Sequence, residues 1–312
     1  MKRYASALLL ALSVVSVAQA AEVVRIGFQK GGGLALMIKK DGSLERALAP
    51  AGVSVKWIEF PAGPQMLEAL NAGSVDFGST GAPPPIFSQA AGADLVYVAA
   101  EPPPITSEAI IVKGDSTIRT VADLRGRKVA FQRGSGSHLL LVAALEKAGL
   151  SLRDVQATYL PPAEARAAFE AGAIDAWVIW DPYLAAAQHV YRPRVIADRT
   201  GLLPAYGFYL ASRKLVERSP ATLSTVLEQF AATGQWANTH QKEMIEMMAP
   251  QVGVPKEVIA TWLGRSHAGT MPVTPEVAAS QQKVADLLYR EKVIPRPVTI
   301  AGHVWTWKPK PR

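Results

Sequence analysis

Residues 60–87 read FPAGPQMLEALNAGSVDFGSTGAPPPIF, and this stretch decides the fold. Its apolar spacing predicts a short helix over residues 66–71, a strand over residues 74–77, and a second helix with three prolines in its first turn. A Ser-Thr-Gly turn at residues 79–81 lies between the strand and the second helix. Hydroxyl and N–H groups converge at such a junction, so we expect it to form one wall of a binding site.

The same order of elements returns about 100 residues later, as LPPAEARAAFEAGAIDAWVIWDPY at residues 160–183. Asp76 corresponds to Asp175, and the upstream segment RIGFQKGGG at residues 25–33 corresponds to KVAFQRGSGS at residues 128–137. Periods of roughly 20 to 50 residues are typical of solenoids. Two much longer copies indicate paired α/β lobes instead.

Composition agrees with a globular chain of about two domains, because 49% of the 312 residues are hydrophobic and 19% are charged. The sequence has no cysteine, which excludes disulfides, a thiolate nucleophile, iron–sulfur clusters and cysteine zinc sites.

Residues 1–20 have the pattern of a cleaved secretory signal: Lys2 and Arg3, an apolar run over residues 7–17, and an Ala-Gln-Ala site. No later apolar run is long enough to span a bilayer. Without the two basic residues the formal charge falls from +7 to +5. We therefore expect a soluble, periplasmic protein whose mild basicity, without Lys/Arg runs, suits a small anion better than nucleic acid.

The order of predicted strands and helices divides the chain into three parts. Residues 21–104 form the first part of lobe I, residues 105–204 form lobe II, and residues 205–312 return to lobe I with a helical C-terminal region. Crossings are expected near residues 102–105, which are rich in proline, and near residues 203–207. The tail from residue 295 onward is expected to wrap the surface.

Four loops open a helix at the end of a predicted strand, near Gln29, Ser79, Gly134 and Asp181. Backbone N–H groups at a helix N-terminus favour a bound anion. The first loop matches neither a Walker P-loop nor a dinucleotide fingerprint, and a flexible turn explains it equally well. An ordinary N-cap is the commoner explanation for any single site of this kind, but the fourfold occurrence favours a shared function.

Two tryptophans lie on the last strand of the second copy. Alternation along a strand places Trp177 and Trp180 on opposite faces, and we expect Trp180, nearer the carboxyl end, to face the cleft.

Enzymatic and metal chemistry receive no support from the sequence. The five histidines lack metal-ligand spacing, no Gly-x-Ser-x-Gly elbow is present, and the acidic residues are scattered, so we predict no catalytic residue, metal or cofactor.

The chain resembles the exported solute-binding proteins of ABC importers for aliphatic sulfonates, which are related to taurine- and nitrate-binding proteins. The resemblance covers nearly the whole mature chain, and its most specific segments are residues 25–31, 57–81, 89–97, 121–124, 129–138, 159–169 and 180–183. A triple glycine at residues 31–33 departs from the family, whose members more often have a serine there.

The resemblance implies a periplasmic binding protein fold of type II, in which two α/β lobes with two hinge crossovers close over a ligand. A sulfonate is ionised at neutral pH and needs N–H and O–H donors rather than a proton-transfer partner. The sulfonate contacts expected are Gln29, Ser79, Thr80, Gly81, Ser135 and Ser137. Trp180, Asp181 and Tyr183 would shape the alkyl pocket, although Asp181 is more simply a helix cap than a partner for an amine.

The partners implied are a small aliphatic sulfonate and an ABC permease in the inner membrane, with a monomeric protein serving sulfur acquisition. Taurine, nitrate, bicarbonate and thiamin precursors remain alternative ligands. An enzyme on the same fold is a rival from another class, but the related pyrimidine synthases need a cysteine-rich motif that this chain lacks.

Overall fold

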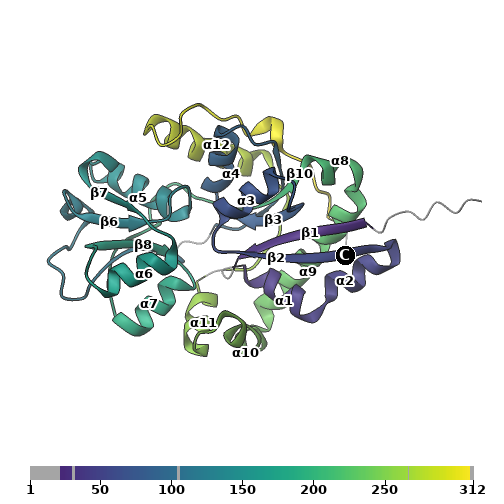
Figure 1. Cartoon of the computed structure of the whole chain (residues 1–312), viewed down its shortest axis with the longest axis horizontal. Coiled ribbons are helices and arrows are strands. Elements are labelled where there is room, and N and C mark those ends of the chain that lie inside the picture. Colours follow the sequence, from purple (N-terminus) through teal and green to yellow (C-terminus); the bar gives the residue numbers. More distant parts are fainter. Residues whose placement is uncertain (1–21, 30–31, 104–105, 266, 310–312) are drawn as a thin grey trace, which may run out of the picture.

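A computed structural model describes residues 22–29, 32–103, 106–265 and 267–309. The predicted signal segment and Gly31 lie outside these residues. The chain forms two lobes, each built on a five-stranded sheet with helices on both faces (Figure 1). This arrangement confirms the predicted class of two α/β lobes.

The sheet of lobe I has the strand order β2–β1–β3–β10–β4. In it, β10 runs antiparallel to both of its neighbours, whereas β2, β1 and β3 are parallel. The strand bounds are β1 (Glu22–Gln29), β2 (Val53–Phe60), β3 (Phe77–Thr80), β4 (Leu95–Glu101) and β10 (Gly207–Ser212).

The sheet of lobe II has the order β7–β6–β8–β5–β9, with β5 antiparallel to its neighbours. Its strands are β5 (Glu108–Val112), β6 (Lys128–Phe131), β7 (Gln156–Tyr159), β8 (Ala176–Trp180) and β9 (Arg194–Asp198). The two orders match position by position, and in each lobe the antiparallel strand is the one that has just crossed from the other lobe. The chain crosses between β4 and β5 and again between β9 and β10.

Helices cover both sheets, and most of the C-terminal ones belong to lobe I (Figure 1). Their bounds are α1 (Gly33–Asp41), α2 (Ser43–Leu48), α3 (Gly63–Asn71), α4 (Pro83–Ala90), α5 (Gly136–Lys147), α6 (Pro162–Glu170), α7 (Tyr183–Tyr191), α8 (Arg213–Arg218), α9 (Pro220–Thr239), α10 (Gln241–Val252), α11 (Lys256–Leu263) and α12 (Pro275–Arg290). The described residues also form four short 3-10 helices: η1 (Ala49–Ala51), η2 (Val121–Leu124), η3 (Leu152–Asp154) and η4 (Ala301–His303).

The two aspartates of the repeat play the same structural role. Asp76 accepts the backbone N–H of Arg25 at 2.9 Å, and Asp175 accepts that of Lys128 at 2.8 Å. In return, the N–H groups of the two aspartates donate to the carbonyls of the same partners. Each aspartate therefore anchors the first strand of its copy, within β1 at Arg25 and at the first residue of β6, which explains why the repeat includes it.

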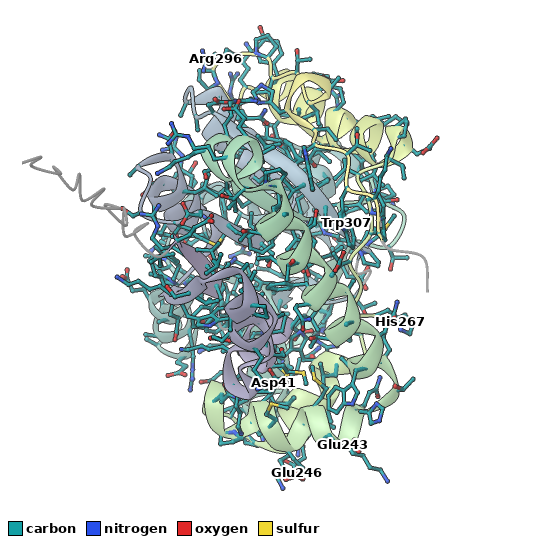
Figure 2. The ribbon with its side chains drawn as sticks, turned by 90° about the vertical axis from the view of Figure 1, so that its right-hand side faces the viewer. Asp41, Glu243, Glu246, His267, Arg296 and Trp307 are labelled. Carbon is teal, nitrogen blue, oxygen red and sulfur yellow. The ribbon has the colours of Figure 1, made fainter. Side chains whose placement is uncertain are left out.

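One expectation from the sequence was wrong in position. The strand predicted over residues 74–77 is β3 at Phe77–Thr80, because Gly73 adopts a left-handed conformation and Asp76 bonds to Arg25, so the preceding residues form a turn. The tail does not only wrap the surface. Trp307 is buried, and Arg296 donates to the carbonyls of Ala90 and Gln89 (Figure 2).

Candidate ligand-binding cleft

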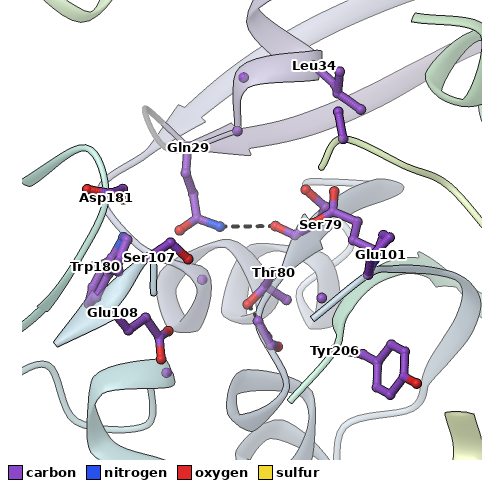
Figure 3. A pocket seen from close by; sticks show the side chains of 18 of the residues that line it. Gln29, Leu34, Ser79, Thr80, Glu101, Ser107, Glu108, Trp180, Asp181 and Tyr206 are labelled. Atoms are coloured by element: carbon purple, nitrogen blue, oxygen red, sulfur yellow. Dashed lines mark hydrogen bonds between the residues drawn. The ribbon is translucent and has the colours of Figure 1, made fainter. Parts of the chain in front are cut away.

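A cavity of about 260 Å³ lies between the lobes, at the carboxyl ends of the parallel strands of both sheets (Figure 3). This is the position at which ligands bind in open α/β sheets. The first residues of three helices line the cavity: Gly33 of α1, Gly63 of α3 and Gly136 of α5. Three positive helix termini therefore face the same space.

Four predicted residues form the lobe I wall: Gln29, Ser79, Thr80 and Gly81. Gln29 lies at the end of β1, and its Nε2 donates to the carbonyl of Ser79 at 3.0 Å (Figure 3). A Cβ atom on Gly63 would lie 2.3 Å from Thr80 Oγ1, so glycine is required for α3 to begin against this hydroxyl. These four residues thus contribute hydroxyl, amide and backbone groups and no charged side chain.

The proline-rich start of α4 supplies fewer N–H donors than the sequence suggested. Its first three residues are prolines, which carry no N–H group, so the donors at this helix are limited to the preceding residues such as Gly81 and Ala82. The helix dipole still favours an anion at this end.

In lobe II, Ser135 and Gly136 line the cavity at the start of α5. Ser135 Oγ donates to the carbonyl of Gln132 at 2.7 Å and lies 2.9 Å from Ser137 Oγ. Ser137 is fully buried and does not line the cavity. It lies behind Ser135 and orients that hydroxyl rather than facing the cavity itself.

An ion pair of lobe II was missed by the sequence analysis. Arg199 and Glu108 both line the cavity, with Arg199 Nη2 2.6 Å from Glu108 Oε2. The guanidinium also donates to the carbonyl of Gly136 at 3.1 Å. A Cβ atom on Gly136 would lie 1.9 Å from Glu108 Oε1, so glycine is required here as well. Because Glu108 neutralises Arg199, the ion pair carries little net positive charge that could attract an anionic ligand.

Of the aromatic residues named from the sequence, only Trp180 lines the cavity. Trp180 lines the cavity, whereas Trp177 is 1% exposed and lies in the core of lobe II, as strand alternation predicted. Tyr183 does not line the cavity and instead contacts the ring of Trp180 edge-on at 6.3 Å. Burial raises the pKa of Tyr183. Tyr183 therefore holds Trp180 in place rather than contacting the cavity.

Asp181 lines the cavity and caps α7. Its Oδ1 accepts the N–H of Ala185 at 2.9 Å, in the first turn of α7, which begins at Tyr183. Arg265 Nη1 lies 3.1 Å from the same oxygen. Burial raises the pKa of Asp181 to about 6, against the opposing effect of Arg265.

Other lining residues come from parts of the chain that the motifs did not include. Glu101 ends β4, and among the described residues it has no ion-pair partner. Burial raises its pKa, which favours the neutral carboxyl group and reduces repulsion of an anion. Apolar lining residues come from α1 and from the C-terminal helices, namely Leu34, Phe230, Met244, Trp262 and Leu263.

His138 supports the α5 turn without lining the cavity. Its Nδ1 accepts the N–H of Gly134 at 3.1 Å, and its ring contacts Phe87, Phe131 and Tyr159. Burial lowers its pKa to about 4.

The buried neutral His138 predicts a loss of stability in acid. In the unfolded chain His138 binds a proton near pH 6.5, whereas in the folded protein it does so only near pH 4. The contribution of neutral His138 to the free energy of unfolding is therefore complete above pH 6.5 and is lost as pH falls toward 4. Over that window we expect a loss on the order of 3 kcal/mol. Urea unfolding at pH 7 and 4.5 should show a smaller difference for His138→Gln than for wild type. The exposed His189→Gln serves as control, and an unchanged pH dependence in His138→Gln would contradict the assignment.

Within the described residues, no cluster of three or more His, Cys, Asp or Glu side chains is placed to hold a metal ion. The helices described are also too short or too polar to cross a membrane.

Two α/β lobes that meet over a cleft, with uncharged donors contributed by both, have the architecture of the two-lobed solute-binding class. Residues 48–244 match the family model described as NMT1/THI5 like, and the chain belongs to this family. It is 48% identical over 300 residues to the putative aliphatic sulfonates-binding protein of Escherichia coli K12, covering 95% of this chain and 93% of that protein. A putative aliphatic sulfonates-binding protein of Bacillus subtilis is 31% identical over 278 residues, covering 89% and 84%.

Solved structures agree with this assignment. The alkanesulfonate-binding protein from Xanthomonas axonopodis pv. citri bound to MOPS matches with a TM-score of 0.87 and 41% identity, covering 92% of this chain and 99% of that chain. The desulfurization enzyme DSZB shares the fold with a TM-score of 0.68 but only 16% identity. The fold by itself therefore does not separate binding from catalysis.

Proposed function

We propose that the protein captures aliphatic sulfonates outside the cytoplasm and delivers them to an ABC importer for sulfur acquisition. The observation that carries this proposal is a cleft whose uncharged donors come from both lobes, in a chain 48% identical to an aliphatic sulfonates-binding protein. Arg199 in the same cleft is neutralised by Glu108, so helix termini, hydroxyls and amides must bind the anion.

We place the sulfonate head group between Thr80 and Gly81 of lobe I and Ser135 of lobe II, whose hydroxyl would turn from the carbonyl of Gln132 to donate to the anion. A buried anion needs such donors because its desolvation without them would cost several kcal/mol. Gln29 and Ser79 complete the wall, and their mutual hydrogen bond fixes the orientation of the Gln29 amide. Ser137 supports Ser135 from behind.

The alkyl chain is placed along the apolar part of the cavity. Trp180, backed by Tyr183, forms one side, and Leu34, Phe230 and Trp262 form another. An alkyl chain bound there would gain roughly 0.8 kcal/mol for each buried CH₂ group.

We also propose the activity, location, oligomeric state and partner of the protein. The protein acts as a binding protein and not as an enzyme, it is a periplasmic monomer, and it docks on a permease of the inner membrane. Its lobes are divided at residues 104 and 204, near the two crossings. Taurine and nitrate are the alternative ligands.

A thermal-shift panel on the mature protein tests the proposed function, because ligand binding to the native state raises Tm. The panel contains ethane- and pentanesulfonate, taurine, sulfate, nitrate and a neutral alcohol. We expect the largest upward shift for pentanesulfonate and none for the alcohol. A shift with nitrate alone, or no shift at all, would contradict the proposal.

A further inference from the structure

One ion pair joins the two lobes at the edge of the cleft. Asp181 follows β8 of lobe II, whereas Arg265 follows α11, which packs against α10 of lobe I. Arg265 Nη1 lies 3.1 Å from Asp181 Oδ1 and 3.2 Å from Oδ2, and its Nη2 donates to Gln188 Oε1 of α7. A single guanidinium of lobe I thus holds two side chains of lobe II.

This ion pair is largely buried. The side chain of Asp181 is 1% exposed and that of Arg265 is 17% exposed. Beside them α7 packs against α11, and Ala185 belongs to the same apolar cluster as Val258 and Trp262 (Figure 1). The two lobes therefore share an apolar contact beside the ion pair, so separation of the lobes would break both.

A second ion pair between the lobes provides a comparison. Arg290 of α12 contacts Glu146 of α5, but these side chains are 59% and 43% exposed. Water and salt screen such a pair, and it contributes little. The Asp181–Arg265 pair differs because removal of Arg265 would leave a buried carboxylate without a counter-ion.

We propose that Arg265 is a positioning residue that sets ligand affinity without contacting the ligand, by holding α7 against α11 in the closed arrangement of the lobes. This inference rests on the proposed function, because it requires a ligand bound between the lobes. Apparent affinity falls in proportion to the fraction of molecules in the binding-competent state. The contacts of Asp181 with Ala185 and Arg265 also occupy its carboxylate, which argues against its use as a partner for an amine of the ligand.

Calorimetric titration with hexanesulfonate tests the effect on affinity. Arg265→Gln should weaken binding about 30-fold or more, mainly through faster dissociation. The double variant Arg265→Gln/Asp181→Asn should recover part of this loss, because no buried charge is then unpaired. Arg290→Gln is the matched control and should stay within about twofold of wild type. Equal affinities for Arg265→Gln and Arg290→Gln would overturn the proposal, and so would the absence of any recovery in the double variant.

A distance measurement without ligand tests the closure itself and does not depend on the proposed function. The chain has no cysteine, so spin labels can be attached to Lys56→Cys on β2 and Gln156→Cys on β7, both exposed and in different lobes. Arg265→Gln should shift the distribution of distances between the labels relative to wild type and to Arg290→Gln. An identical distribution in all three would overturn the proposal. A wild-type protein that binds no sulfonate in the titration would contradict the proposed function instead.

Discussion

Thr80→Val is expected to weaken alkanesulfonate binding by about 10- to 100-fold, because a hydrogen bond to a charged group contributes roughly 1.5–3 kcal/mol. Thr80 is 6% exposed, lines the cavity at the end of β3, and lies against the first residue of α3. Valine has nearly the same shape, so the packing against Gly63 should be preserved while the hydroxyl is lost. Titration calorimetry with hexanesulfonate measures the change.

The matched control is Thr117→Val, at an exposed position outside the cavity. It should bind like wild type. If Thr80→Val kept the wild-type affinity while its Tm was unchanged, Thr80 would be removed from the head-group site.

Trp180→Ala is expected to weaken hexanesulfonate binding on the order of 30-fold, but methanesulfonate binding only about threefold or less. The difference follows from the proposed binding mode, in which Trp180 lies beside the alkyl chain and the head group binds near Thr80 and Ser135. The ratio of the two affinities, measured by calorimetry, isolates the apolar contact from any general damage to the site.

Trp236→Ala is the control for this experiment, since Trp236 stacks on His240 and does not line the cavity. It should leave the ratio unchanged. An equal loss for both sulfonates in Trp180→Ala would place Trp180 in the scaffold rather than beside the ligand.

The fold was predictable because the sequence signals that specify its strands, helices and turns are local and occur in two copies. The strand periodicity, the glycine and proline signals and the second copy of each are contiguous in sequence, and Asp76 and Asp175 preserve one contact in both lobes. The antiparallel positions of β5 and β10 were not predictable, since each strand joins a sheet whose other strands lie far away in the chain. The start of β3 was also misjudged, because the turn after Gly73 depends on the partner Arg25.

The candidate site was predictable only where its residues lie on one motif. Thr80 and Trp180 are the last residues of β3 and β8, and Ser135 lies in the loop between β6 and α5, so their position at the carboxyl ends of strands follows from the pattern. The pairs Glu108–Arg199 and Asp181–Arg265 join residues 91 and 84 positions apart, and only the folded chain brings them together. Asp181 stands in a quoted motif, but that motif does not indicate Arg265 as its partner, and Glu108, Arg199 and Arg265 stand in none.

The most direct test of the central claim is a crystal structure of the mature protein with hexanesulfonate. The account predicts the sulfonate oxygens within hydrogen-bond distance of Thr80 in lobe I and Ser135 in lobe II, with the alkyl chain against Trp180. A sulfonate bound outside this cleft, or bound within it through Arg199 after rupture of the ion pair with Glu108, would contradict the claim that uncharged donors of both lobes bind the anion.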